Sequence, residues 1–199
     1  MYLSNIMNIP PIYRLCQAPF ADKKFAPIVA MNDLQQVRRA LDVGCGPGTN
    51  THYFQDKEYL GIDINESYIE NARKRYDKNF IVADVAKFTV PQEDHFDFIL
   101  VNSFLHHIGI PSTRRVLSQL NYLLTQDGHV HILDLVYPET PGLARLMAEW
   151  DRGDYSRPLL KWKELFTKYF ELVEFHPYSL VFLGISLWNM VYFKGKKRI

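Results

Sequence analysis

One nine-residue run, residues 41–49, constrains this chain of 199 residues more than any other feature. Apolar residues on both sides of Asp42 lead directly into three glycines, Gly44, Gly46 and Gly48, each separated by one residue. Glycine has no Cβ, so it lets the backbone turn sharply and approach a ligand closely. The run therefore predicts a buried strand that ends in a ligand-binding turn. We expect a helix to follow, with its first N–H groups facing the ligand.

The glycine spacing distinguishes two kinds of nucleotide-like cofactor site. The dinucleotide fingerprint G-x-G-x-x-G would need a glycine at position 49, where this chain has Thr49. The observed Asp-x-Gly-x-Gly-x-Gly resembles motif I of the class I S-adenosylmethionine-dependent methyltransferases. The alternative is a chance glycine loop after a buried strand, so the rest of the chain must supply the context.

The composition is that of a single globular domain, with 47% hydrophobic and 23% charged residues. The formal net charge of +1 gives no general attraction for nucleic acid, and we expect no nucleic-acid partner. The two cysteines, Cys16 and Cys45, indicate no disulfide framework, and we expect a cytoplasmic protein. The longest apolar stretch, residues 181–193, is too short for stable membrane insertion. No Cys/His spacing indicates a metal, and nothing indicates the oligomeric state.

From residue 40 onward, short apolar runs alternate with helical patterns, which is typical of a parallel sheet covered by helices. One helix is expected to begin at Asn65, which can cap its N-terminus. A second is expected to begin at Pro111 or Ser112 and to end at Gly128. The five predicted strands are residues 40–43, 59–64, 80–83, 96–101 and 129–135.

The C-terminal part departs from this alternation. Residues 142–152 and 158–170 have helical patterns, whereas residues 171–183 and 185–194 are predicted strands. The connection through Gly184 is too short for a parallel crossover, so these two strands must be antiparallel. A parallel sheet closed by an antiparallel hairpin is also a feature of the methyltransferase fold.

The resemblance implies an α/β fold: a Rossmann-like, doubly wound, seven-stranded sheet of order 3-2-1-4-5-7-6 with strand 7 antiparallel. Residues 37–199 are expected to form the S-adenosylmethionine-binding domain. Residues 1–36, which combine prolines with apolar side chains, are expected to form a lid or cap over cofactor and substrate.

The resemblance also implies the cofactor, S-adenosyl-L-methionine, and its contacts. Asp63 ends the second strand, nineteen residues after Gly44, where a carboxylate can accept two hydrogen bonds from a ribose diol. Asp84 and Val85 follow the third strand and are expected at the adenine ring. The expected cofactor-binding residues are Asp42, Gly44, Cys45, Gly46, Gly48, Asp63, Ile64, Asp84, Val85 and Asn102.

Two of these residues are expected near the methionyl amine. Asn102 ends the fourth strand, where a backbone carbonyl commonly holds that amine in the family. Asp42 is placed to contact the same amine, or alternatively to accept hydrogen bonds from the glycine turn.

Two histidines, His106 and His107, follow the fourth strand and are the expected catalytic residues. An imidazole near neutral pKa can take a proton from the acceptor as the methyl arrives. Alternatively, both rings only pack and hydrogen-bond at the start of the next helix. Tyr13, Arg14 and Tyr137 are expected substrate or lid contacts, each with a structural alternative.

The function expected from the resemblance is methyl transfer from S-adenosylmethionine to a small, partly hydrophobic molecule. The segment after the fourth strand lacks the Asn/Asp-Pro-Pro-aromatic pattern used for base or amide nitrogen, so oxygen or carbon is favoured as the acceptor over nitrogen. One alternative is a methyltransferase that acts on a protein side chain. Another is a subunit that binds the cofactor without catalysis, because fold resemblance alone does not decide function.

Overall fold

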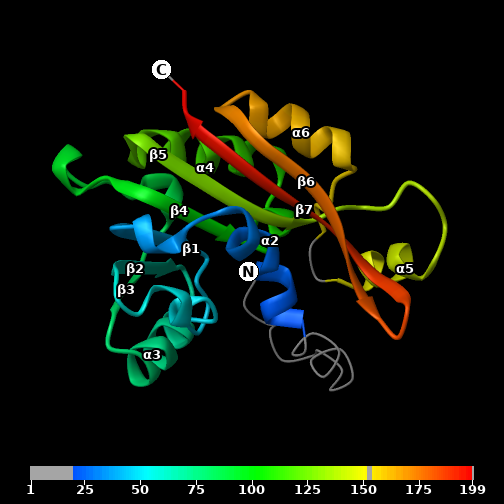
Figure 1. Cartoon of the computed structure of the whole chain (residues 1–199), viewed down its shortest axis with the longest axis horizontal. Coiled ribbons are helices and arrows are strands. Elements are labelled where there is room, and N and C mark those ends of the chain that lie inside the picture. The colour runs from blue at the N-terminus through cyan, green and yellow to red at the C-terminus, as the bar shows by residue number, and fades with distance from the viewer. Residues whose placement is uncertain (1–19, 152–153, 199) are drawn as a thin grey trace.

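The computed structural model describes residues 20–151 and 154–198. At its centre is a seven-stranded sheet of order β3-β2-β1-β4-β5-β7-β6 (Figure 1). Strands β1 to β5 pair in parallel, whereas β7 is antiparallel to both of its neighbours, as predicted. The strands are β1 Arg39–Val43, β2 Glu58–Asp63, β3 Asn79–Val82, β4 Phe96–Asn102, β5 Leu124–Leu135, β6 Phe170–Phe182 and β7 Ile185–Lys197.

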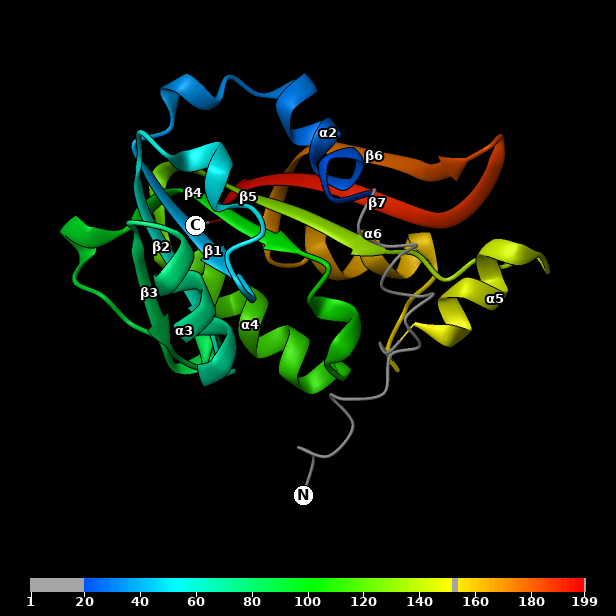
Figure 2. The same ribbon diagram turned by 90° about the horizontal axis from the view of Figure 1, so that it is seen from below.

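Helices cover both faces of the sheet, and α2 and α4 lie on opposite sides (Figure 2). Among the described residues, no helix combines the length and the apolar character needed to cross a membrane. The α-helices are α2 Ala21–Met31, α3 Glu66–Arg75, α4 Ile110–Leu123, α5 Leu143–Trp150 and α6 Leu159–Thr167. Short 3₁₀ turns are η2 Leu34–Gln36, η3 Thr51–Phe54, η4 Val85–Lys87, η5 Gln92–Asp94 and η6 Leu105–His107.

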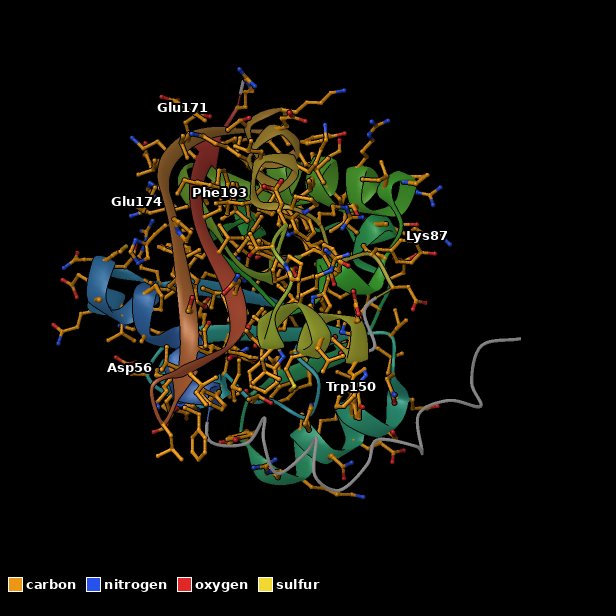
Figure 3. All side chains as sticks on the ribbon, turned by 90° about the vertical axis from the view of Figure 1, so that its right-hand side faces the viewer. Asp56, Lys87, Trp150, Glu171, Glu174 and Phe193 are labelled. Carbon is orange, nitrogen blue, oxygen red and sulfur yellow. The ribbon has the colours of Figure 1, made fainter. Side chains whose placement is uncertain are left out.

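The sheet is buried on both faces, which explains why its strands are almost continuously apolar. Along β4, Ile99 and Val101 join the core beneath α4 and α6. Phe98 and Leu100 point the other way, into the core shared with α2 and α3. Phe193 of β7 extends the first core towards α6 (Figure 3).

The β6–β7 hairpin closes through two residues. Leu183 and Gly184 have φ angles of +49° and +79°. Two consecutive left-handed residues form the tight turn whose twist matches antiparallel strands. The predicted hairpin is therefore confirmed, with its turn at Gly184.

The helix predicted after β2 is also confirmed. The Asn65 side chain accepts a hydrogen bond from the Tyr68 N–H at 3.3 Å and so caps α3. Ile69 and Ala72 are buried against the sheet. This cap fixes the direction in which the chain leaves the end of β2.

The prediction of a helix directly after the glycine run is wrong. Residues Thr51–Phe54 form only the short turn η3, and β2 begins at Glu58. Phe54 is fully buried, so it anchors this turn in the core and leaves too few residues for a longer helix. A ligand at the glycine turn therefore meets backbone N–H groups without the dipole of a long helix.

The predicted end of the second helix at Gly128 is also wrong. Helix α4 ends at Leu123, and β5 begins at the next residue. A Cβ on Gly128 would lie 2.8 Å from the carbonyl oxygen of Phe96, closer than atoms can pack. This glycine permits a close approach to β4 instead of ending a helix.

Gly61 in β2 should not tolerate a side chain. A Cβ there would lie 2.6 Å from the Phe80 ring and 2.9 Å from the Cys45 sulfur. We expect Gly61→Ala to lower the free energy of unfolding by about 1–3 kcal/mol, measured by urea denaturation. Gly109→Ala is the matched control, since the nearest described atom to its Cβ would be a Tyr155 ring carbon at 3.5 Å, an ordinary contact. Equal stability of the two variants would contradict this packing.

Candidate functional site

A cavity of about 1100 Å³ lies at the carboxyl ends of β1, β2, β3 and β4. The strand order reverses between β1 and β4, which is where open α/β sheets bind ligands. Six of the ten expected cofactor residues line this cavity: Gly44, Gly46, Asp63, Ile64, Asp84 and Val85.

The glycine turn is fastened to the end of β2. The N–H groups of Gly44 and Cys45 donate to the carbonyl oxygen of Ile62, at 2.8 and 3.1 Å. Gly44, Gly46 and Gly48 have φ angles of +67°, +53° and +81°, a region that side chains disfavour. The glycines therefore produce a turn in which backbone replaces side chains at the cavity wall.

Asp63 completes this connection. Its Oδ2 accepts a hydrogen bond from the Gly46 N–H at 3.0 Å, and its Oδ1 accepts one from the Asn65 N–H at 2.8 Å. A carboxylate oxygen accepts more than one hydrogen bond, so Asp63 retains capacity for a ligand. The residue thus lines the cavity and also shapes the turn.

Asp84 and Val85 form the next part of the wall. The Asp84 side chain accepts from the Ala86 N–H at 3.0 Å and caps η4. This cap holds the segment after β3 in a fixed conformation, with Val85 buried beside it.

Asp42 lies behind the cavity wall, in a buried polar network. Its Oδ2 accepts hydrogen bonds from the Tyr59 hydroxyl at 2.8 Å and from the Asn50 amide at 3.3 Å. Asn50 in turn accepts one from the Asn102 amide at 3.0 Å. Asp42 Oδ1 is buried and has no hydrogen-bond partner among the described residues, which carries a free-energy cost. Burial raises the pKa of Asp42 to about 6.

Three expected cofactor residues besides Asp42 do not line the cavity: Cys45, Gly48 and Asn102. Cys45 is buried under the turn, and this burial raises the pKa of its thiol and so favours the protonated form. The N–H of Gly48 donates to the Cys45 carbonyl oxygen and closes the turn. The Asn102 side chain belongs to the Asp42 network. In this geometry, the side chains of Cys45 and Asn102 support the cavity from behind.

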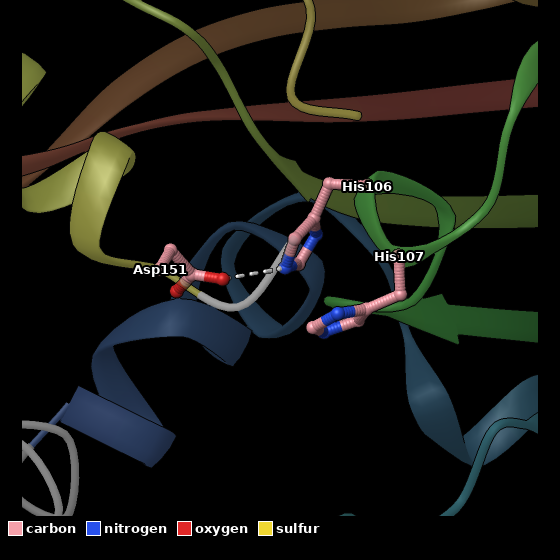
Figure 4. A group of neighbouring side chains, drawn as sticks. All are labelled: His106, His107 and Asp151. Carbon is pink, nitrogen blue, oxygen red and sulfur yellow. Dashed lines mark ion pairs between the residues drawn. The ribbon is translucent and has the colours of Figure 1, made fainter. Parts of the chain in front are cut away.

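The two histidines have different surroundings (Figure 4). His107 is exposed and lines the cavity, whereas the His106 side chain is only 4% exposed and lies outside it. His106 Nδ1 lies 2.6 Å from Asp134 Oδ1, and its Nε2 lies 3.2 Å from Asp151 Oδ1. Burial alone would lower the pKa of His106, but the two carboxylates outweigh it and raise the pKa to about 9.

Sequence reasoning missed Lys24 of α2, whose ammonium group donates to the Ser103 hydroxyl at 3.3 Å. Burial lowers the pKa of Lys24, although the carboxylates of Asp151 and Asp134 oppose that shift. Ser103 lines the cavity with a φ of +54°, a strained value for serine that often marks a functional position. No local pattern indicated Lys24, because its partners lie far away in the sequence.

Of the expected substrate or lid contacts, the structure describes Tyr137, which does not line this cavity. Tyr137 donates a hydrogen bond to Glu149 at 2.9 Å and lines a separate depression beside β6 and β7. The expected role of Tyr137 as a substrate or lid contact stays a prediction. Tyr13 and Arg14 lie outside the described residues. Of the expected lid, α2 packs on β5, β6 and β7.

Comparisons with known proteins identify methyltransferases. The profile of a family described as "Methyltransferase domain" matches residues 40–128. A trans-aconitate 2-methyltransferase from Methylobacterium radiotolerans is 32% identical over 117 residues, which cover 55% of this chain and 44% of that protein. The chain thus matches less than half the length of this relative. An uncharacterized methyltransferase from Staphylococcus carnosus is 25% identical, covering 68% of this chain and 64% of that protein.

Solved structures share the fold. The N-methyltransferase NodS from Bradyrhizobium japonicum, in complex with S-adenosyl-L-homocysteine, aligns with a TM-score of 0.71 at 16% identity, covering 96% of this chain and 93% of that one. The mitomycin 7-O-methyltransferase MmcR aligns with a TM-score of 0.69 at 18% identity, covering 93% of this chain and 56% of that one. The glycine turn, the strand order and these matches agree: residues 40–128 match the methyltransferase domain family, and the chain has the fold of S-adenosylmethionine-dependent methyltransferases.

Proposed function

We propose that this protein transfers a methyl group from S-adenosylmethionine to a small, partly hydrophobic acceptor, with oxygen or carbon favoured over nitrogen as the accepting atom. The observation that carries the proposal is one cavity that joins the glycine turn, the Asp63 carboxylate and the segment at Asp84. These are three elements suited to the methionyl, ribose and adenine parts of one cofactor.

Each part of the cofactor has a suitable group in this arrangement. The Asp63 carboxylate is available to a ribose diol, and Asp84 with Val85 stands where the adenine ring would lie. Asp42 Oδ1, buried and unpaired within the part of the chain that the structure describes, suits the ammonium group of the methionyl part. A cation supplied by the cofactor would remove the cost of leaving this oxygen unpaired.

The cofactor supplies an already activated methyl group, so the protein's task is to position and enclose the reactants. Ser103, Phe104 and His107 line the end of the cavity that follows β4. We assign the acceptor to this end, with His106 and His107 taking part in the chemistry. Among relatives, trans-aconitate 2-methyltransferases suggest carboxylic acids as the first acceptors to test.

Cofactor binding should depend on Asp63. We expect wild-type protein to bind S-adenosylhomocysteine in a calorimetric titration and Asp63→Ala to bind at least about tenfold more weakly, because hydrogen bonds to a carboxylate are lost. Asp63→Asn keeps one acceptor oxygen and should fall between them. Asp56→Ala is the matched control, since Asp56 precedes the opposite end of β2 and its side chain is 75% exposed (Figure 3). A folded wild type that binds no S-adenosylhomocysteine would contradict the proposed function.

Cofactor affinity should also depend on pH through Asp42. The pKa of this carboxyl is raised to about 6 by burial, and a bound ammonium group favours its charged form. Affinity should therefore be constant above pH 6 and fall by up to about tenfold per pH unit below it. Asp42→Asn should bind more weakly and lose this dependence. If the cofactor affinity of Asp42→Asn kept the pH dependence of the wild type, Asp42 would not be the group that binds the amine.

Turnover is tested with S-adenosylmethionine that carries an isotopic label in its methyl group. We expect the label to appear in a small molecule when carboxylic acids, including trans-aconitate, and phenols are offered as acceptors. Transfer of the label to protein instead would contradict the assigned substrate class. Asp63→Ala should reduce labelling in parallel with its loss of cofactor affinity.

A further inference from the structure

We propose that His106, His107 and Asp151 bind a divalent first-row transition metal ion beside the acceptor end of the cofactor cavity. One ligand atom from each residue lies within 4.8 Å of the others (Figure 4). Two imidazoles with one carboxylate are a recurring ligand set for such ions, and they leave further coordination positions open. Residue spacing does not indicate this site, because Asp151 follows α5, far along the chain from the histidines.

The distances suit a common ion. Metal ions bind nitrogen and oxygen ligands at ~2.0–2.2 Å, so two ligands of one ion are roughly 3.0–3.5 Å apart. His106 Nε2 and Asp151 Oδ1 are 3.2 Å apart, within that interval. The His107 ring lies 4.1 Å from the His106 ring and is exposed, so it can close the remaining gap by side-chain rotation.

A second carboxylate orients the first histidine. His106 Nδ1–H donates to Asp134 at 2.6 Å, which directs the lone pair of Nε2 towards Asp151. Asp134 is itself fixed, because it accepts the N–H groups of Leu105 and Leu135, each at 2.8 Å. A carboxylate that holds the outer nitrogen of a metal-bound histidine is the usual support of such sites.

The competing arrangement is a metal-free ion pair. In it, the His106 ring carries a proton on each nitrogen and bridges Asp134 and Asp151 as a cation. A metal ion would take the place of the Nε2 proton, which leaves to solvent. The two arrangements differ in whether a proton or a metal ion lies between His106 Nε2 and Asp151. The visible absorption of bound Co²⁺ distinguishes them.

The ion's role rests on the proposed methyl transfer. Because His107 lines the cavity, an ion at this site would be available to an oxygen of the acceptor. Coordination lowers the pKa of a bound hydroxyl, whose proton then leaves to solvent. The resulting oxygen forms its bond to the methyl carbon as the carbon–sulfur bond breaks, which releases neutral S-adenosylhomocysteine. The site thus favours an oxygen acceptor that binds metal.

The test is titration of the chelator-treated full chain with Co²⁺, which reports nitrogen and oxygen ligands through its visible absorption bands. We expect one equivalent to bind, and His107→Ala and Asp151→Asn to weaken binding at least about tenfold. Asp134→Asn should weaken it about 10- to 100-fold without removing a ligand. His52→Ala is the matched control, because His52 is also an exposed histidine near a carboxylate, with its Nε2 3.8 Å from Asp22 Oδ1. This substitution should leave the cobalt spectrum unchanged.

Thermal melting of each variant shows that it is folded before it is titrated. A folded wild type whose cobalt spectrum stays that of the free ion would overturn the metal site and leave His106 as the bridging cation. Cobalt binding by His107→Ala and Asp151→Asn that is as tight as that of the wild type would overturn it as well. Titration of the same samples with S-adenosylhomocysteine separates the two proposals. A wild type that binds cobalt but not S-adenosylhomocysteine would contradict only the proposed methyltransferase function.

Discussion

The site depends on the attachment of the glycine turn to the end of β2. Two backbone N–H groups donate to the Ile62 carbonyl oxygen, and a third donates to the Asp63 carboxylate. These hydrogen bonds require the chain to pass through left-handed conformations that glycine adopts without strain. Because β1 and β2 are adjacent parallel strands, the attachment brings together a turn and a carboxylate that are remote in sequence. The cavity is a consequence of that pairing.

A second carboxylate plays a comparable part on the other side of β1. Asp134 at the end of β5 fixes the turn after β4 through the Leu105 N–H and the His106 ring. The chain after α5 reaches the same place through Asp151. In the proposed function, Asp63 thus organises the cofactor end of the cavity and Asp134 organises the turn beside the acceptor end. In both cases, a buried or half-buried carboxylate satisfies backbone N–H groups that would otherwise be unpaired.

The sequence predicted most of the fold because its signals are local. Strand positions, the Asn65 cap and the Gly184 hairpin follow from neighbouring residues, whereas the strand order came from family resemblance. Gly128 was misinterpreted because a glycine that permits close packing has the same sequence signal as one that ends a helix. The contacts of Lys24 and Asp151 were not predictable, since both depend on segments that meet only in the folded chain.

The most direct test is a crystal structure of the protein with S-adenosylhomocysteine. We expect the ribose diol at the Asp63 carboxylate, the adenine ring beside Asp84 and Val85, and the amine within hydrogen-bond distance of Asp42 Oδ1. That last contact would pair the Asp42 oxygen that has no hydrogen-bond partner in residues 20–151 and 154–198. S-adenosylhomocysteine bound elsewhere, or bound in the cavity with this oxygen still unpaired, would contradict the assigned cofactor site.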